Sequence, residues 1–174
     1  MATYNQAQDA IDAAYNKNTD VSYKRSEAYN QLAAFNYDTF VTAWSVYSLL
    51  IPPAAILTPA IYVLIAADLA TLAGHKDEYE AKFTASVNEQ TNGIAPYLDA
   101  QNLRDEGYAF EQGSNPTSAE AKYNQAIIAA NSALAIWTSA YGLAHQAYQA
   151  VGAVDGKMQS MADTSYYPAN PGRP

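Results

Sequence analysis

The feature that most constrains the fold of this chain is a run of 32 residues, 123–154, that contains no Asp, Glu, Lys or Arg. Within this run, apolar and aromatic residues recur in alternating steps of three and four positions. Such spacing places them on one face of an α-helix and repeats every seven residues, as in helices that pack along their length. We therefore expect a long central helix of a bundle, with a buried stripe of Ile127, Ala130, Leu134, Trp137, Tyr141, Ala144, Tyr148 and Val151.

The start of this central helix has a local signal of its own. The segment Thr117-Ser118-Ala119-Glu120 has the form of a capping box, in which a Thr and a Glu bind each other's free backbone N–H groups at a helix start. The sequence leaves two alternatives for the C-terminal end of this helix, one at Asp155-Gly156 and one at about Asp163. The sequence predicts a helix from residue 117 to about 154, or on to about 163.

A second charge-free run covers 29 residues, 39–67, and prolines interrupt it. Pro52-Pro53 stops a helix, because proline lacks the backbone donor and restrains the residue before it. Each arm is about 20 Å long at about 1.5 Å per residue, shorter than the roughly 30 Å core of a bilayer. The run therefore predicts a helical hairpin with an apolar tip at residues 49–59. An aromatic stripe precedes the tip: Tyr37, Phe40, Trp44, Tyr47 and Ile51.

Two further helices are expected before this hairpin tip. Apolar residues three or four apart predict a short helix from about residue 3 to 16, with Ala7, Ile11 and Ala14 on its buried face. The polar run 16–20 predicts a break. A second helix then extends to about Leu50.

The chain after the prolines predicts one long and one short helix. Thr58-Pro59 is a good start, because Thr caps a helix and Pro fits its first turn. The long helix ends at about Gln90, and we expect Gly93 to adopt the left-handed conformation that closes it. A short helix from Ala95 to Glu106 ends at Gly107. The apolar face of the long helix consists of Ile61, Ile65, Leu72, Tyr79 and Phe83.

Together these segments predict an all-α fold. The expected architecture is an antiparallel helical bundle with three long helices and one or two short ones. A chain of 174 residues is long enough for one sizeable core. We expect a single domain over residues 1–163, followed by an extended, proline-rich tail over residues 164–174.

Composition excludes several classes of function. The net charge is −8 and the nine basic residues are scattered, which disfavours nucleic acid as a partner. With no cysteine there is neither a disulfide framework nor a thiolate nucleophile. The first thirty residues lack the apolar segment of a cleavable signal peptide. Localisation otherwise stays open, and a virion is one location that fits.

The titratable residues form no recognisable catalytic pattern. His75 and Glu78 share a helix face, but the paired Glu-x-x-His motifs of a di-iron bundle are missing. Asp68 lies near the buried face, where we expect it to sit at the edge or to pair with a hydroxyl or a cation. The sequence thus predicts no catalytic, cofactor-binding or metal-binding residue, and we expect a protein that is not an enzyme.

The favoured function is a structural or assembly role. Charged residues are 15% of the chain and tyrosine occurs 15 times, which gives a mostly neutral surface of the kind found at protein interfaces. The expected partners are copies of itself or other protein subunits, as in a virion or a filament. The residues predicted to make these contacts are Leu49, Leu50, Ile51, Pro52, Pro53, Ile56, Leu57, Tyr166 and Tyr167.

Three environments of the apolar tip stay open from the sequence. The rest of the bundle could cap it, a second protein subunit could bury it, or it could dip into a membrane. The membrane alternative makes the chain a pore-former or a peripheral anchor with an inserted hairpin. A small-ligand pocket near Trp44, Trp137 and Tyr141 is a further hypothesis.

Overall fold

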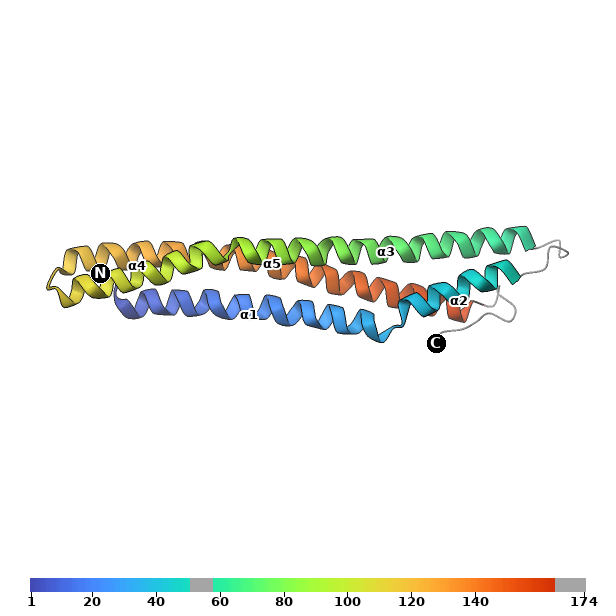
Figure 1. Ribbon diagram of the computed structural model, residues 1–174, viewed down its shortest axis with the longest axis horizontal. Helices are drawn as coiled ribbons and strands as arrows, with labels where there is room; N and C mark the ends of the chain where they lie inside the picture. The colour runs from blue at the N-terminus through green and yellow to red at the C-terminus, as the bar shows by residue number, and fades with distance from the viewer. Residues whose placement is uncertain (51–57, 165–174) are drawn as a thin grey trace. The chain divides into compact units, whose positions relative to one another are not determined.

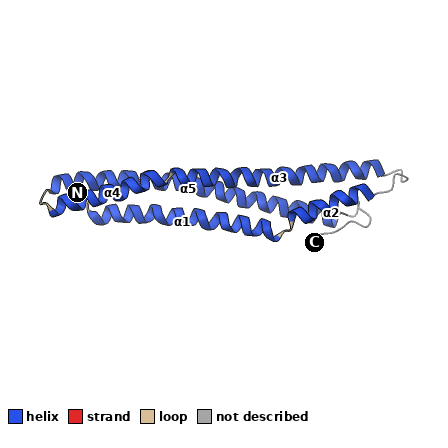
Figure 2. Cartoon of the chain, viewed as in Figure 1, coloured by secondary structure: helices blue, strands red, loops and turns tan. Residues whose placement is uncertain are grey.

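The computed structural model describes the backbone of residues 1–50 and 58–164, and the side chains of residues 1–49 and 61–164. The described backbone is helical with no strand (Figure 2). The prediction of an all-α helical bundle is confirmed: three helices have 31, 35 and 48 residues, and two shorter ones have 14 and 19. In chain order they are α1 (Tyr4–Ala34), α2 (Tyr37–Leu50), α3 (Thr58–Asn92), α4 (Ile94–Gln112) and α5 (Pro116–Asp163) (Figure 1).

Helix α1 is continuous through residues 16–20, so the predicted break there is wrong. The polar residues of this run find partners inside the helix. The Thr19 hydroxyl donates to the Tyr15 carbonyl at 3.2 Å, and Lys17 forms an ion pair with Asp20 at 3.1 Å.

The first long arm instead breaks at Phe35-Asn36, where the sequence predicted an unbroken helix. Asn36 has a φ of 51°, in the left-handed region that Asn tolerates better than most residues. Its carbonyl accepts the backbone N–H of Phe40 at 3.0 Å, in the first turn of α2. The break therefore redirects the chain with little loss of backbone hydrogen bonding.

Gly93 separates α3 from α4, but not in the predicted way. Its φ is −74°, so the expected left-handed conformation is wrong. A Cβ at this position would lie 2.3 Å from Nε1 of Trp137. Glycine is needed here because an indole ring occupies the space of a side chain.

Helix α4 continues past its predicted end at Gly107 to Gln112. Gly107 is buried within the helix, where a Cβ would lie 2.6 Å from the ring of Tyr123. This glycine is also a site of close packing and not a helix terminus.

The turn between α4 and α5 uses a different cap from the predicted one. Helix α5 begins at Pro116, and the side-chain oxygen of Asn115 accepts the backbone N–H of Ser118 at 3.2 Å. Asn followed by Pro at the first helical position is a favourable start. The predicted capping box beginning at Thr117 is therefore wrong. A reciprocal box does occur at the start of α1, between Thr3 and Gln6.

The chain divides into two compact units. Unit 1 consists of residues 1–25 and 83–145, and unit 2 of residues 26–82 and 146–174, of which 51–57 and 165–174 lie outside the described part. The expected single domain of residues 1–163 stays a prediction. The predicted extended tail lies outside the described residues from 165 onward.

Unit 1 has a core rich in alanine. Ala7 packs with Tyr123, Ile11 with Ala130, and Val21 with Ala140, so the first part of α1 runs in the same direction as α5. Helix α4 runs in the opposite direction. Its Gly107 faces Tyr123 near the start of α5, and Gly93 faces Trp137 further along. Small side chains let the three helices approach closely along the unit.

Unit 2 has a more conventional core of large side chains. Phe40 and Trp44 of α2 are fully buried, as the aromatic stripe predicted. Their ring centroids are 5.7 Å apart. The other buried members of the cluster are Ile65, Leu72, Val154, Met158 and Met161.

The buried stripe of α5 has the predicted period, but the prediction misplaced half of its members. Buried residues recur in alternating steps of four and three from Ala119 to Met161. Four predicted residues belong to this stripe, and the other four lie only half-buried beside it. The full stripe is Ala119, Tyr123, Ala126, Ala130, Ala133, Trp137, Ala140, Ala144, Ala147, Val151, Val154, Met158 and Met161.

Among the helices in the described part of the chain, α5 alone is long and apolar enough to cross a membrane by these two criteria. The core helices of many water-soluble proteins meet the same criteria. This finding therefore assigns no membrane role by itself.

Candidate functional site

Only one of the predicted interaction residues has a described side chain. Leu49, in the last turn of α2, is 76% exposed. Leu50 ends α2, and its side chain is not described. The other seven lie outside the described residues: Ile51, Pro52, Pro53, Ile56, Leu57, Tyr166 and Tyr167.

Helices α2 and α3 of unit 2 expose large apolar side chains on both sides of residues 50–60. Leu49 and Val63 have the largest exposed fractions, 76% and 63%. The other members are about half exposed. We call this set the α2–α3 apolar surface, and it consists of Val46, Leu49, Tyr62, Val63 and Leu64.

The α2–α3 apolar surface carries no formal charge. Charged residues first appear at Asp38 on α2 and at Asp68 on α3. Asp68 forms a partly buried ion pair with Lys157 of α5, so the expected pairing with a cation is confirmed. The α2 and α3 segments between these two positions offer a partner only apolar and neutral polar groups.

A second candidate site is a pocket at the break between α1 and α2, also within unit 2. Its volume is about 440 Å³. We call it the break pocket. Its walls come from the end of α1, the start of α2 and the middle of α3: Tyr29, Leu32, Ala33, Asn36, Tyr37, Asp38, Thr39, Lys76, Tyr79 and Glu80.

One ammonium group already lies in the break pocket. Lys76 Nζ is 2.7 Å from a carboxylate oxygen of Glu80 and 5.3 Å from the ring centroid of Tyr37. Its hydrogen bond to Glu80 raises the pKa of Lys76, although partial burial opposes this. Burial raises the pKa of the Tyr37 and Tyr79 phenols.

Unit 1 contains a polar cluster at positions where its helices otherwise bury apolar residues. The Gln90 amide donates to the Asn18 side chain and to the Ser22 hydroxyl, and its side-chain oxygen accepts from Arg25. Trp137 Nε1 donates to the Gln90 carbonyl at 2.8 Å. Burial lowers the pKa of Arg25. These groups bind one another, as expected of a layer that aligns helices.

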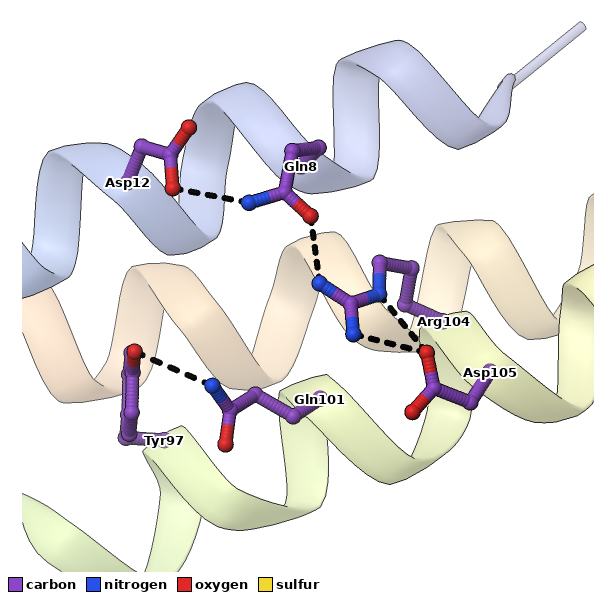
Figure 3. Close-up of polar contacts among 6 residues, drawn as sticks. All are labelled: Gln8, Asp12, Tyr97, Gln101, Arg104 and Asp105. Carbon is purple, nitrogen blue, oxygen red and sulfur yellow. Dashed lines mark hydrogen bonds and ion pairs between the residues drawn. The ribbon is translucent and has the colours of Figure 1, made fainter.

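A second polar link joins α1 to α4 in unit 1, and Figure 3 shows it in close-up. Arg104 of α4 donates to the side-chain oxygen of Gln8 of α1. Its Nη2 and Nε also lie 2.7 and 2.9 Å from Oδ1 of Asp105. Gln8 in turn donates to Asp12 at 2.7 Å. Because each of these drawn groups has a partner within the unit, the arrangement holds two helices together and leaves little capacity for a ligand.

Both histidines and both tryptophans lie among the described residues. His75 is half-buried and His145 is exposed. In the described part of the chain, no three His, Asp or Glu residues are placed to hold a metal ion. Trp44 is buried in the core of unit 2, and Trp137 in the core of unit 1.

Sequence reasoning missed the break pocket, because its lining comes from three separated segments. One signal was present in Asn36, since asparagine is enriched among non-glycine residues with positive φ. Comparison with protein-family models, with curated proteins and with solved structures gives no match.

Proposed function

We propose that this chain is a non-enzymatic structural or assembly protein that acts through protein–protein contacts. The observation that carries this proposal is the exposure of the α2–α3 apolar surface. Full burial of a Val or Leu side chain is worth about 1.5–3 kcal/mol relative to leaving it in water. Burial of Leu49 and Val63, the two most exposed of these side chains, would therefore supply a substantial share of a binding energy.

The lack of charge on this surface favours a second copy of the chain as its partner. Each copy has a net charge of −8, so most pairs of faces would bring carboxylates together. Two α2–α3 apolar surfaces can meet without such repulsion between their own residues. Isologous contacts of this kind are the commonest in homo-oligomers.

The oligomeric state of the purified chain tests this proposal. Sedimentation equilibrium over a wide concentration range is expected to give a mass above that of one chain. Leu49→Asp and Val63→Asp should each shift the equilibrium toward monomer, because each places a carboxylate in the contact. The matched control is Ile128→Asp, since Ile128 of α5 is 70% exposed but belongs to unit 1. A wild-type chain that stays monomeric throughout would overturn the proposal.

The same exposed side chains also favour a second function, insertion into the apolar region of a membrane. Flotation with phosphatidylcholine vesicles separates the two. Vesicle binding that Leu49→Asp abolishes and Ile128→Asp preserves, together with a monomeric chain in solution, would support the membrane function instead.

A further inference from the structure

We propose that the break pocket binds an ammonium or guanidinium group. The source of this cation is a Lys or Arg side chain of a partner protein or a free polyamine. The proposal is independent of the α2–α3 apolar surface, because it uses other residues of unit 2 and does not require the chain to self-associate.

The first support is the aromatic lining of the pocket. Three tyrosines, Tyr29, Tyr37 and Tyr79, come from α1, α2 and α3. Tyr79 is only 6% exposed and forms part of the wall, whereas Tyr29 is 61% exposed. A cation over the face of a Tyr ring is attracted by the negative face of its π-system. Tyr29 therefore offers an aromatic surface that solvent and ligands can reach.

The second support is the charge of the lining. Asp38 and Glu80 are acidic and Lys76 is the one basic residue, so the lining has a net charge of −1. The Lys76 ammonium is paired with Glu80 at 2.7 Å. Glu80 is thus partly neutralised, and Asp38, exposed in the first turn of α2, brings the remaining negative charge.

The third support is the position of Lys76 itself. Its ammonium lies 5.3 Å from the centroid of the Tyr37 ring and touches Glu80, so the pocket holds a cation between an aromatic ring and a carboxylate. The same lining contains another tyrosine ring, that of the exposed Tyr29, and a second carboxylate, that of Asp38, for an incoming cation. Lys76 then acts as an internal competitor, because its charge repels the incoming group.

The test is an NMR titration of the ¹⁵N-labelled full chain. Nα-acetyl-lysine methylamide is the probe for a side chain, and spermidine is the probe for a polyamine. We expect saturable shifts of backbone signals in residues 29–39 and 76–80. Nα-acetyl-norleucine methylamide, which has an apolar side chain without the ammonium group, should cause no such shifts. Spermidine binding more than about tenfold tighter than the lysine probe would identify a free polyamine as the source.

Three variants make the test specific. Tyr29→Leu should weaken the lysine probe roughly threefold, as expected for loss of one exposed cation–π contact. The matched control is Tyr23→Leu, since Tyr23 is 68% exposed on α1 but lies in unit 1. Asp38→Asn should also weaken binding. Lys76→Met should strengthen it, because it removes the competing charge.

The effect of Lys76→Met also shows whether the ligand of the pocket is positively or negatively charged. If acetate shifts the same signals and Lys76→Met abolishes that shift, the pocket is an anion site and the proposal is wrong. Equal shifts from the lysine and norleucine probes would overturn it too. Signals outside the pocket that stay unchanged in each variant show that the fold is intact.

Discussion

Replacing Gly93 by alanine is the sharpest test of how unit 1 is packed. Ala can adopt the φ of −74° found here, so backbone strain is not the issue. The added Cβ would lie 2.3 Å from Trp137 Nε1 and 2.7 Å from Cδ1. The indole is 1% exposed, and its N–H donates to the Gln90 carbonyl at 2.8 Å. The ring must therefore move within a closed core and give up this hydrogen bond.

The expected cost follows from three effects. Overpacking a core costs about 1–3 kcal/mol. Loss of the buried hydrogen bond costs about another 1–3 kcal/mol. Exchange of glycine for alanine raises the free energy of unfolding by about 0.4–1 kcal/mol, because alanine restricts the conformations of the unfolded chain. Gly93→Ala is therefore expected to lower the free energy of unfolding by about 3 kcal/mol.

Urea unfolding followed by circular dichroism measures this change, with Gly142→Ala as the matched control. Gly142 lies inside α5, and a Cβ there would meet nothing within 4 Å. The control should raise the free energy of unfolding by up to about 1 kcal/mol, the difference in helix propensity between Gly and Ala. A Gly93→Ala chain as stable as the wild type would refute the packing described for Trp137.

Two further predictions concern buried polar groups of unit 1. The Tyr123 hydroxyl donates to a carboxylate oxygen of Glu111 at 2.6 Å. Burial, together with this hydrogen bond, raises the pKa of Tyr123 to about 12. The neutral phenol therefore stabilises the fold below pH 10, and this stabilisation is lost as the pH rises toward 12. Tyr123→Phe should remove that part of the alkaline unfolding transition, measured by tyrosinate absorbance and circular dichroism at each pH. Ser86 is fully buried and donates to the Ala140 carbonyl at 2.8 Å, so Ser86→Ala should cost about 1 kcal/mol in urea unfolding. The exposed Ser132→Ala should cost less, and equal effects of the two would contradict this assignment.

Periodicity predicted the helices well, because a buried face repeats along the whole length of each one. The aromatic stripe of α2 is buried at Phe40 and Trp44, as its spacing indicated. Breaks were harder to predict, because they depend on single residues whose partners come from elsewhere in the chain. The run 16–20 continues as helix partly because Asn18 binds Gln90, which is 72 residues away.

The candidate sites were predictable to different degrees. The charge-free run predicted an apolar tip, but its spacing left the environment of that tip open. Leu49, the one predicted contact residue with a described side chain, is exposed. The break pocket could not be expected, because it depends on the change of direction at Asn36 and on the side of α3 that faces it. Neither the direction nor the facing side follows from the local sequence.

The register of α4 against α5 in unit 1 depends on two aromatic residues rather than on the many alanines. Alanines at every third or fourth position look alike after a shift of seven residues, so they distinguish registers poorly. Gly93 and Gly107 are 14 residues apart, as are Tyr123 and Trp137, and each aromatic ring fills the space over one glycine. A shift of seven residues would bring Trp137 opposite Ala100. The Cβ of Ala100 would then clash with the indole, in the same way as a Cβ added at position 93. The glycines, read from sequence as helix ends, thus specify how the two helices align.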